Sequence, residues 1–152
     1  MTNMKNNIKV NLIDNSASVF FKPSETQVNF WLVNCLKKKY EKVDINLVLL
    51  DDDEMQKLNI NFRSRMNATN VLSFPEDNST SLVGEIMICP NIAAKEAKQF
   101  AKSNHDYFLY LFVHGILHLQ GYDHIDDDDA ELMETEENLL FENILKLSNK
   151  TN

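Results

Sequence analysis

The chain has 152 residues, of which 43% are hydrophobic and 25% charged, which suits one folded domain and argues against a disordered protein. No apolar run is long enough to cross a bilayer, and polar residues interrupt any signal-peptide core near the N-terminus, so we expect a cytoplasmic protein without a membrane partner. The net charge of −8 argues against a protein that coats nucleic acid, so a polyanionic ligand would have to be held locally.

We expect residues 1–152 to form a single domain, with the polar residues 1–7 and 148–152 frayed at its ends. The two cysteines, Cys35 and Cys89, each lie alone in an apolar segment. This pattern predicts two reduced core thiols rather than a disulfide, because disulfides are rare in the cytosol.

The first sixty residues are predicted to contain two strands and two helices. Ser24 and Gln27 have the spacing of a capping box, and apolar residues follow at helical intervals. In chain order, the predicted elements are a strand over Ile8–Ile13, a helix opened by Pro23 and Ser24, a strand over Val43–Leu50 and a short helix capped by Asp51–Asp53.

The rest of the chain is predicted to hold two strands and three helices. The strands are Thr69–Phe74 and Val83–Cys89, and the helices are Asn91–Ser103, Tyr107–Gln120 and Asp127–Leu147. For the first and last of these helices, the residues expected to face inward are Ala93, Ala94, Ala97, Phe100 and Ala101, then Leu132, Leu139, Leu140 and Ile144. Strands and helices do not alternate strictly, which predicts an α+β domain with a mixed four-stranded sheet packed against about five helices.

Three of the four histidines lie in one short segment, His114-Gly-Ile-Leu-His118-Leu-Gln-Gly-Tyr-Asp-His124. His114 and His118 are four residues apart on a predicted helix, which puts both rings on one face, one turn apart. Gly121 can adopt the left-handed conformation that ends a helix, so the chain can return His124 to that face. Three imidazoles that converge on one point are the ligand set of an open zinc site, with the fourth position free for water.

The alternative is a group of hydrogen-bonded core histidines, which is the usual explanation of a single histidine on an apolar face. The spacing and the intervening glycine favour the metal site instead. All-nitrogen ligation favours one Zn²⁺ ion over magnesium or calcium and leaves Ni²⁺, cobalt or iron open. His105 lies outside the pattern, and we expect it to face solvent.

The histidine spacing also resembles the H-E-x-x-H-x-x-G-x-x-H motif of metzincin peptidases, but Gly115 stands where those enzymes have a glutamate. A peptidase uses that carboxylate to activate water and to carry a proton to the leaving amine. Peptide hydrolysis is therefore disfavoured. Gly115 either lets a bulky anionic group approach the helix or serves simple helix packing, and the sequence leaves both open.

The only two arginines, Arg63 and Arg65, lie just before the predicted strand at Thr69. An arginine suits phosphate binding because its planar fork can grip two oxygens at once, although either residue could be an ordinary surface cation.

Three blocks of the sequence resemble the YbeY family of bacterial metal-dependent endoribonucleases, which act in ribosomal RNA maturation. They are Leu58-Asn-Ile-Asn-Phe-Arg63 followed by Thr69-Asn-Val-Leu-Ser-Phe-Pro75, then Val83-Gly-Glu-Ile-Met-Ile88, and the histidine segment continued through Ile125-Asp-Asp-Asp. The resemblance covers about residues 40 to 142. Three positions depart from the common family residues: Met66, Ala68 and Glu85.

The resemblance implies a zincin-like α+β fold, zinc held by His114, His118 and His124, and Arg63 in the catalytic cleft. It implies single-strand-specific cleavage of RNA in 16S rRNA 3′-end maturation and ribosome quality control. The implied partners are ribosomal RNA, the small ribosomal subunit, its ribosomal proteins and a ribosome-assembly GTPase. The nucleophile is left open between a metal-activated water and the ribose 2′-hydroxyl, and no general base is identified.

Neighbouring charged residues have structural explanations that compete with functional ones. Asp123 could orient a ligand or simply fix the turn, and Asp126–Asp129 are better explained by helix capping than by a second metal. Lys95, Lys98 and Lys102 share a helix face that could touch RNA, although a solvated face is the simpler explanation.

Two other functions compete with the nuclease. One is a zinc-containing ribosome-assembly factor without essential catalysis, and the other is a metallopeptidase-like hydrolase. An open three-histidine site argues against the first, because structural zinc is usually held by four protein ligands. Gly115 argues against the second.

Overall fold

In the computed structural model, residues 7–62, 68–73, 80–123 and 125–150 are described. Within them the chain forms five helices and four strands, in the order β1 (Ile8–Asn15), α1 (Glu25–Cys35), β2 (Lys42–Leu50), α2 (Asp52–Phe62), β3 (Thr69–Ser73), β4 (Ser81–Ile88), α3 (Pro90–Gln99), α4 (Asn104–Leu119) and α5 (Asp127–Lys150). The α+β class and the five helices are thus confirmed. A zincin-like fold stays a prediction.

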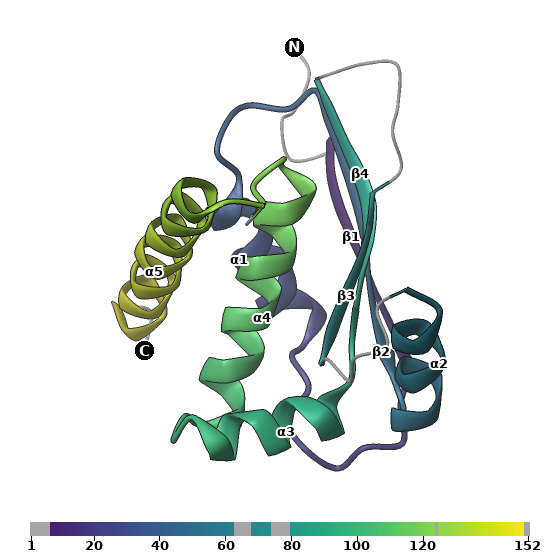
Figure 1. Ribbon diagram of the computed structural model, residues 1–152. Helices are drawn as coiled ribbons and strands as arrows, with labels where there is room; N and C mark the ends of the chain where they lie inside the picture. The colour runs from purple at the N-terminus through teal and green to yellow at the C-terminus, as the bar shows by residue number, and fades with distance from the viewer. Residues whose placement is uncertain (1–6, 63–67, 74–79, 124, 151–152) are drawn as a thin grey trace.

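The strands lie side by side in the order β1-β2-β4-β3. β1, β2 and β4 are parallel, and β3 pairs with β4 in the antiparallel sense. Figure 1 shows α1, α3 and α4 on one side of the sheet and α2 on the other, with α5 packed outside α4. α4, the helix that carries His114 and His118, therefore lies between the sheet and α5.

Local sequence signals mark the starts of α1 and α5. Ser24 caps α1 as predicted: its hydroxyl accepts the Gln27 amide N–H at 3.1 Å, and the Gln27 side chain accepts the Ser24 N–H at 3.0 Å. Asp126 caps α5, because its carboxylate accepts the Asp129 amide N–H at 2.8 Å. The capping explanation of this acidic run is confirmed for Asp126.

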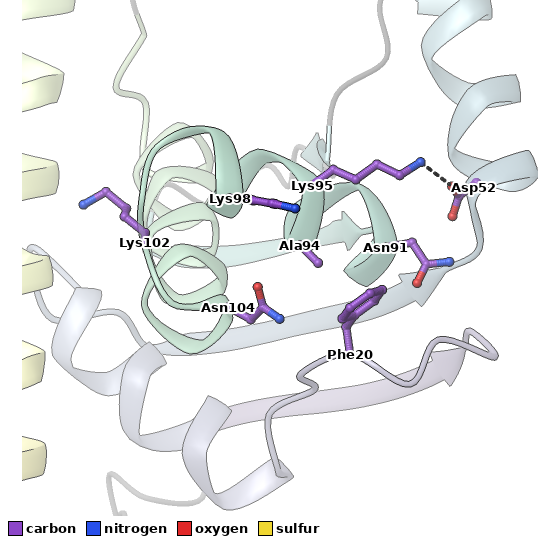
Figure 2. A pocket seen from close by; sticks show the side chains of 8 residues that line it. All are labelled: Phe20, Asp52, Asn91, Ala94, Lys95, Lys98, Lys102 and Asn104. Carbon is purple, nitrogen blue, oxygen red and sulfur yellow. Dashed lines mark ion pairs between the residues drawn. The ribbon is translucent and has the colours of Figure 1, made fainter.

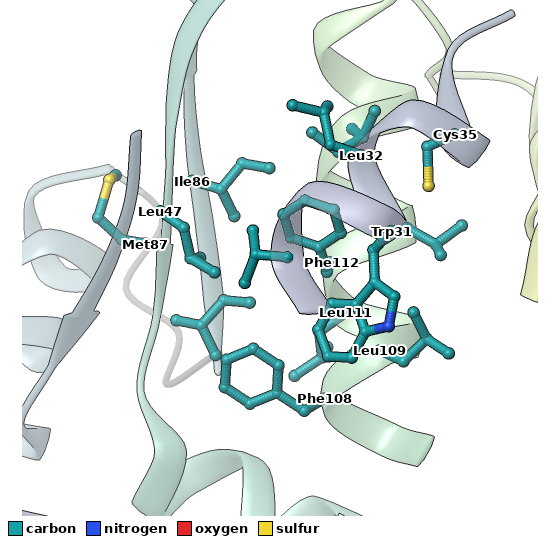
Figure 3. Packing of buried hydrophobic residues seen from close by; sticks show 14 of the residues in the cluster. Trp31, Leu32, Cys35, Leu47, Ile86, Met87, Phe108, Leu109, Leu111 and Phe112 are labelled. Carbon is teal, nitrogen blue, oxygen red and sulfur yellow. The ribbon is translucent and has the colours of Figure 1, made fainter. Parts of the chain in front are cut away.

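The core lies between the sheet and the pair α1 and α4 (Figure 3). β2 turns alternate residues inward as its pattern predicts, and these are buried: Val43, Ile45, Leu47 and Leu49. Trp31 of α1 packs against Phe112 of α4, with ring centroids 5.8 Å apart. Cys35 and Cys89 are buried free thiols, as expected.

Two predicted inward stripes were wrong in part. Phe100 is 61% exposed because α3 ends at Gln99 and Ala101 adopts a left-handed φ of 54°, which breaks the helical spacing. On α5, Leu132 and Leu139 are exposed, while Leu140 and Ile144 are buried as expected. α5 also continues to Lys150, past Ser148, where we expected the chain to fray.

None of the helices in the described part of the chain is both long and apolar enough to span a bilayer.

Candidate metal centre

α4 carries His114 and His118 on one face, one turn apart, as the spacing predicts. Ser103 fixes the start of this helix, because its hydroxyl accepts the Asp106 amide N–H at 3.1 Å. The two imidazole rings meet edge to face, with centroids 4.5 Å apart and planes at 81°. Their Nε2 atoms are 2.9 Å apart, so the two rings converge on one point.

Each ring has a hydrogen-bond acceptor at its other nitrogen. His118 Nδ1 lies 3.0 Å from the backbone carbonyl oxygen of Tyr122, and His114 Nδ1 contacts Oε1 of Glu137. When Nδ1 is the donor on both rings, both Nε2 atoms carry lone pairs and face each other. A cation or a shared proton between them is needed to remove the resulting repulsion.

The pair fits the nitrogen ligands of a zinc ion. Zinc–nitrogen bonds of about 2.0–2.1 Å in a tetrahedral site put two ligand nitrogens roughly 3.3 Å apart. The observed 2.9 Å between the Nε2 atoms is close to that value without any rearrangement of α4. Two imidazoles, each with a hydrogen-bond acceptor at Nδ1, form a donor set of the kind that transition metals use in proteins.

The other predicted site residues, His124 and Arg63, lie outside the described residues. Consistent with this, no cluster of three or more histidine, cysteine or acidic residues suited to a metal is found among the described residues. The structure therefore brings together two of the three predicted metal ligands, and the third ligand and the arginine stay predictions.

The turn that precedes His124 has the predicted form. Gly121 adopts a φ of +102°, a conformation that favours glycine, and its amide N–H donates to the His118 carbonyl at 3.0 Å. The Tyr122 amide N–H donates to the Leu117 carbonyl at 3.0 Å. The chain thus folds back over the end of α4, which is how the Tyr122 carbonyl reaches the His118 ring.

Glu137 of α5 is a residue of this site that the sequence analysis missed. Its side chain is 3% exposed, and Oε2 accepts the Tyr110 hydroxyl at 2.8 Å while Oε1 contacts His114. A signal was available in the sequence, because Glu137 follows Met133 by four residues and precedes Leu140 by three. It therefore interrupts an apolar stripe with a carboxylate, a pattern that indicates a buried partner.

The charge of Glu137 reflects its two partners. Burial raises the pKa of this carboxyl, but hydrogen bonds from His114 and Tyr110 outweigh burial, and the pKa lies below its usual value. Burial, reinforced by Glu137, raises the pKa of Tyr110 in turn. Glu137 is thus a carboxylate at neutral pH, able to accept from both side chains.

Gly115 faces the sheet. It is buried, and a Cβ placed on it would lie 3.1 Å from Cδ1 of Ile86 on β4. Of the two explanations open at the sequence level, this supports close packing of α4 on the sheet. A side chain at this position would crowd Ile86, and the absence of peptidase activity stays a prediction.

Two other sequence expectations concern residues near the helix start and the turn. His105 is partly buried, with its ring 5.1 Å from that of Phe21, so it does not simply face solvent. Asp123 is exposed, and its two possible roles stay open.

The lysines of α3 lie away from the histidines. They line a cavity of about 610 Å³ together with Phe20, Asn91 and Asn104, near the start of α4 (Figure 2). His114 is ten residues beyond Asn104 in α4, a separation of about 15 Å along the helix axis. The side chain of Lys95 is 74% exposed and 3.9 Å from Asp52. These features support a solvated face rather than a part of the metal centre.

Comparisons with known proteins agree with the resemblance. Residues 9–145 match the family described as endoribonuclease YbeY. The protein of that name from Neisseria meningitidis serogroup C is 42% identical over 132 residues, which cover 82% of this chain and 77% of the relative. The one from Pseudoalteromonas translucida is 40% identical over 122 residues, covering 78% and 80%.

A solution structure of a Thermotoga maritima protein has a similar fold. The TM-score is 0.60 at 28% sequence identity, and the match covers 94% of this chain and 93% of the other. Because the family match spans most of the sequence and these relatives are 40–42% identical to it, this chain belongs to the YbeY family of endoribonucleases.

Proposed function

We propose that this protein is a zinc-dependent endoribonuclease that cleaves single-stranded RNA in 16S rRNA 3′-end maturation and ribosome quality control. Family membership supports endonucleolytic cleavage of RNA. The single structural observation that carries the metal dependence is the approach of two oriented imidazoles, with their Nε2 atoms 2.9 Å apart.

In this proposal, His114, His118 and His124 hold one Zn²⁺ ion, with Ni²⁺ or another divalent transition metal as the alternative. A bound ion would act as a Lewis acid on a phosphoryl oxygen and lower the pKa of a bound water towards about 7. Three protein ligands leave one position for water or substrate, which favours a catalytic over a structural site.

The residues of this chain would position the scissile phosphate and balance its charge. α4 is seated on the sheet through Gly115 and Ile86, so His114 and His118 project from a rigid element. Arg63 follows α2 directly in sequence, and its guanidinium would stabilise negative charge that develops on the phosphate. A local dication and one arginine would let a protein of net charge −8 bind RNA.

The proposed partners are ribosomal RNA in the small ribosomal subunit, with its ribosomal proteins and a ribosome-assembly GTPase, in the cytoplasm. These follow from the family resemblance. The non-catalytic assembly factor is the alternative that the test below separates from the nuclease.

The test combines metal analysis with RNA cleavage. The purified protein should contain about one zinc ion per chain, cleave single-stranded RNA, lose cleavage on chelation and recover it when zinc is returned. His118→Ala should lose both zinc and cleavage, and Arg63→Ala should lose cleavage but keep zinc, with Arg65→Ala as the matched control. Cleavage by a folded, metal-free His118→Ala protein at the wild-type rate would contradict the proposal. A zinc-loaded wild-type protein that never cleaves RNA would favour the assembly factor.

A further inference from the structure

We infer that Glu137 is a positioning residue, which holds His114 in the tautomer and orientation that direct its Nε2 atom at the proposed metal ion. The inference rests on the proposed function for the identity of the site. It assigns a task to α5, which carries none of the predicted metal ligands.

The burial of Glu137 needs an explanation beyond packing. It is the one buried charged side chain among the described residues, and removing a carboxylate from water is costly unless it is hydrogen-bonded. Both oxygens are used, Oε1 by the His114 ring and Oε2 by the Tyr110 hydroxyl at 2.8 Å. The carboxylate therefore cannot turn away from His114 without leaving the Tyr110 hydroxyl without this acceptor.

The position of Glu137 is fixed by its own helix. Met133 and Leu140, one turn away on either side, are 2% and 9% exposed and belong to the core. Tyr110 is also packed against Phe141 of α5, with ring centroids 6.3 Å apart. The acceptor at His114 is thus held by packed helices, so it can define where the ring points.

The chemical consequence concerns the proton of a neutral imidazole. A neutral ring carries one proton, which can be on Nδ1 or on Nε2. A carboxylate at Nδ1 keeps the proton there, leaves the lone pair on Nε2 and makes that nitrogen a stronger ligand. Without Glu137, part of the population would carry the proton on Nε2, and the ring would lose the contact that orients it through Nδ1.

Two measurements test this inference without using RNA. The first is zinc affinity, measured by competition with a chelator of known affinity. Glu137→Ala should bind zinc about 10- to 100-fold more weakly than the wild type. Glu137→Gln keeps an acceptor oxygen but loses the charge, so its affinity should lie between the two. Glu131→Gln, an exposed change of equal charge on the same helix, should match the wild type.

The second measurement is the tautomer of His114 in the metal-free protein, read from the ¹⁵N shifts of its ring nitrogens at an alkaline pH at which those shifts no longer change with pH. The wild type should have the proton on Nδ1, and Glu137→Ala should show a mixture. This readout also guards against a variant that fails to fold, because the wild-type tautomer is measured on the native protein.

The inference is overturned if the wild-type ring carries its proton on Nε2, or if folded Glu137→Ala binds zinc as tightly as the wild type. Failure of the proposed function looks different. In that case the protein binds zinc and responds to Glu137 substitution as expected, but does not cleave RNA.

Discussion

The side chain of Gln120 accepts the backbone N–H of Lys37 at 2.7 Å, which joins the end of α4 to the segment that follows α1. The same amide donates through Nε2 to the Cys35 carbonyl at 2.9 Å. One side chain thus satisfies the carbonyl of Cys35, which α1 leaves open at its C-terminal end, and the amide of Lys37 just beyond it. Gln120 is two residues after His118 and directly before Gly121, so this link also anchors the turn beside the candidate metal centre.

Gln120→Ala should lower the free energy of unfolding by about 2 kcal/mol, because it leaves the Cys35 carbonyl and the Lys37 amide without this partner. Urea denaturation of the metal-free protein measures the change. Gln56→Ala, at an exposed position of α2, is the control and should change the stability by less than about 0.5 kcal/mol. Equal effects of the two substitutions would show that the Gln120 link contributes nothing.

Gly115→Ala should destabilise the protein by about 1 kcal/mol, because strain against Ile86 outweighs the gain of about 1 kcal/mol that alanine brings to a helix. In an Ile86→Val background, which removes the atom nearest to the new Cβ, the cost should fall. A double-mutant cycle by urea denaturation measures this coupling. Strictly additive effects would mean that the helix and the sheet do not press on each other at this point.

The protein should lose stability as the pH rises above about 8.5, the pKa of an unperturbed thiol. Burial raises the pKa of Cys35 to about 12 and that of Cys89 to about 11. Above the unfolded pKa, the unfolded chain releases protons that the folded chain keeps, so each thiol costs about 1.4 kcal/mol per pH unit until its folded pKa is reached.

This alkaline effect can be isolated with Cys35→Ala. Between pH values of about 8 and about 10, the variant should lose roughly 2 kcal/mol less than the wild type, because it lacks one of the two thiols. Urea denaturation at the two pH values provides the comparison, and all other titrating groups cancel. An identical loss in both proteins would mean that the Cys35 thiol ionises in the folded state.

The double substitution Lys95→Ala with Lys98→Ala should leave RNA cleavage within about twofold of the wild type, because the cavity that these side chains line is at the start of α4, whereas His114 and His118 are in its second half. Single-turnover cleavage at physiological salt is the measurement. A tenfold loss would assign the α3 face to RNA binding.

Much of the fold is predictable because local patterns determine it. The capping box of Ser24 and Gln27 marks the start of α1, and alternation along β2 identifies its buried face. The order of strands in the sheet, by contrast, depends on contacts between distant segments. Nothing in the sequence of β3 says that it pairs with β4 in the antiparallel sense at an edge.

The errors on α5 have a specific physical cause. Leu132 and Leu139 are seven residues apart and form a plausible apolar stripe, yet the buried stripe runs one residue later, through Met133, Glu137 and Leu140. A carboxylate is ordinarily assigned to solvent, so the true stripe is visible only once His114 and Tyr110 are known to bind Glu137. The convergence of His114 and His118 on α4 was easier to predict, since their spacing is local.

The rings of His114 and His118 differ in how easily one substitution can remove the group that orients them. His118 is oriented by the main-chain carbonyl of Tyr122, an atom that every amino acid supplies, so no replacement of residue 122 deletes it. His114 depends on a side chain that a single codon change in Glu137 can remove. In laboratory evolution towards a different metal, substitutions that change the orientation of the His114 ring should therefore appear at Glu137. Substitutions that move the His118 ring must instead alter the shape of the turn, which is set at Gly121.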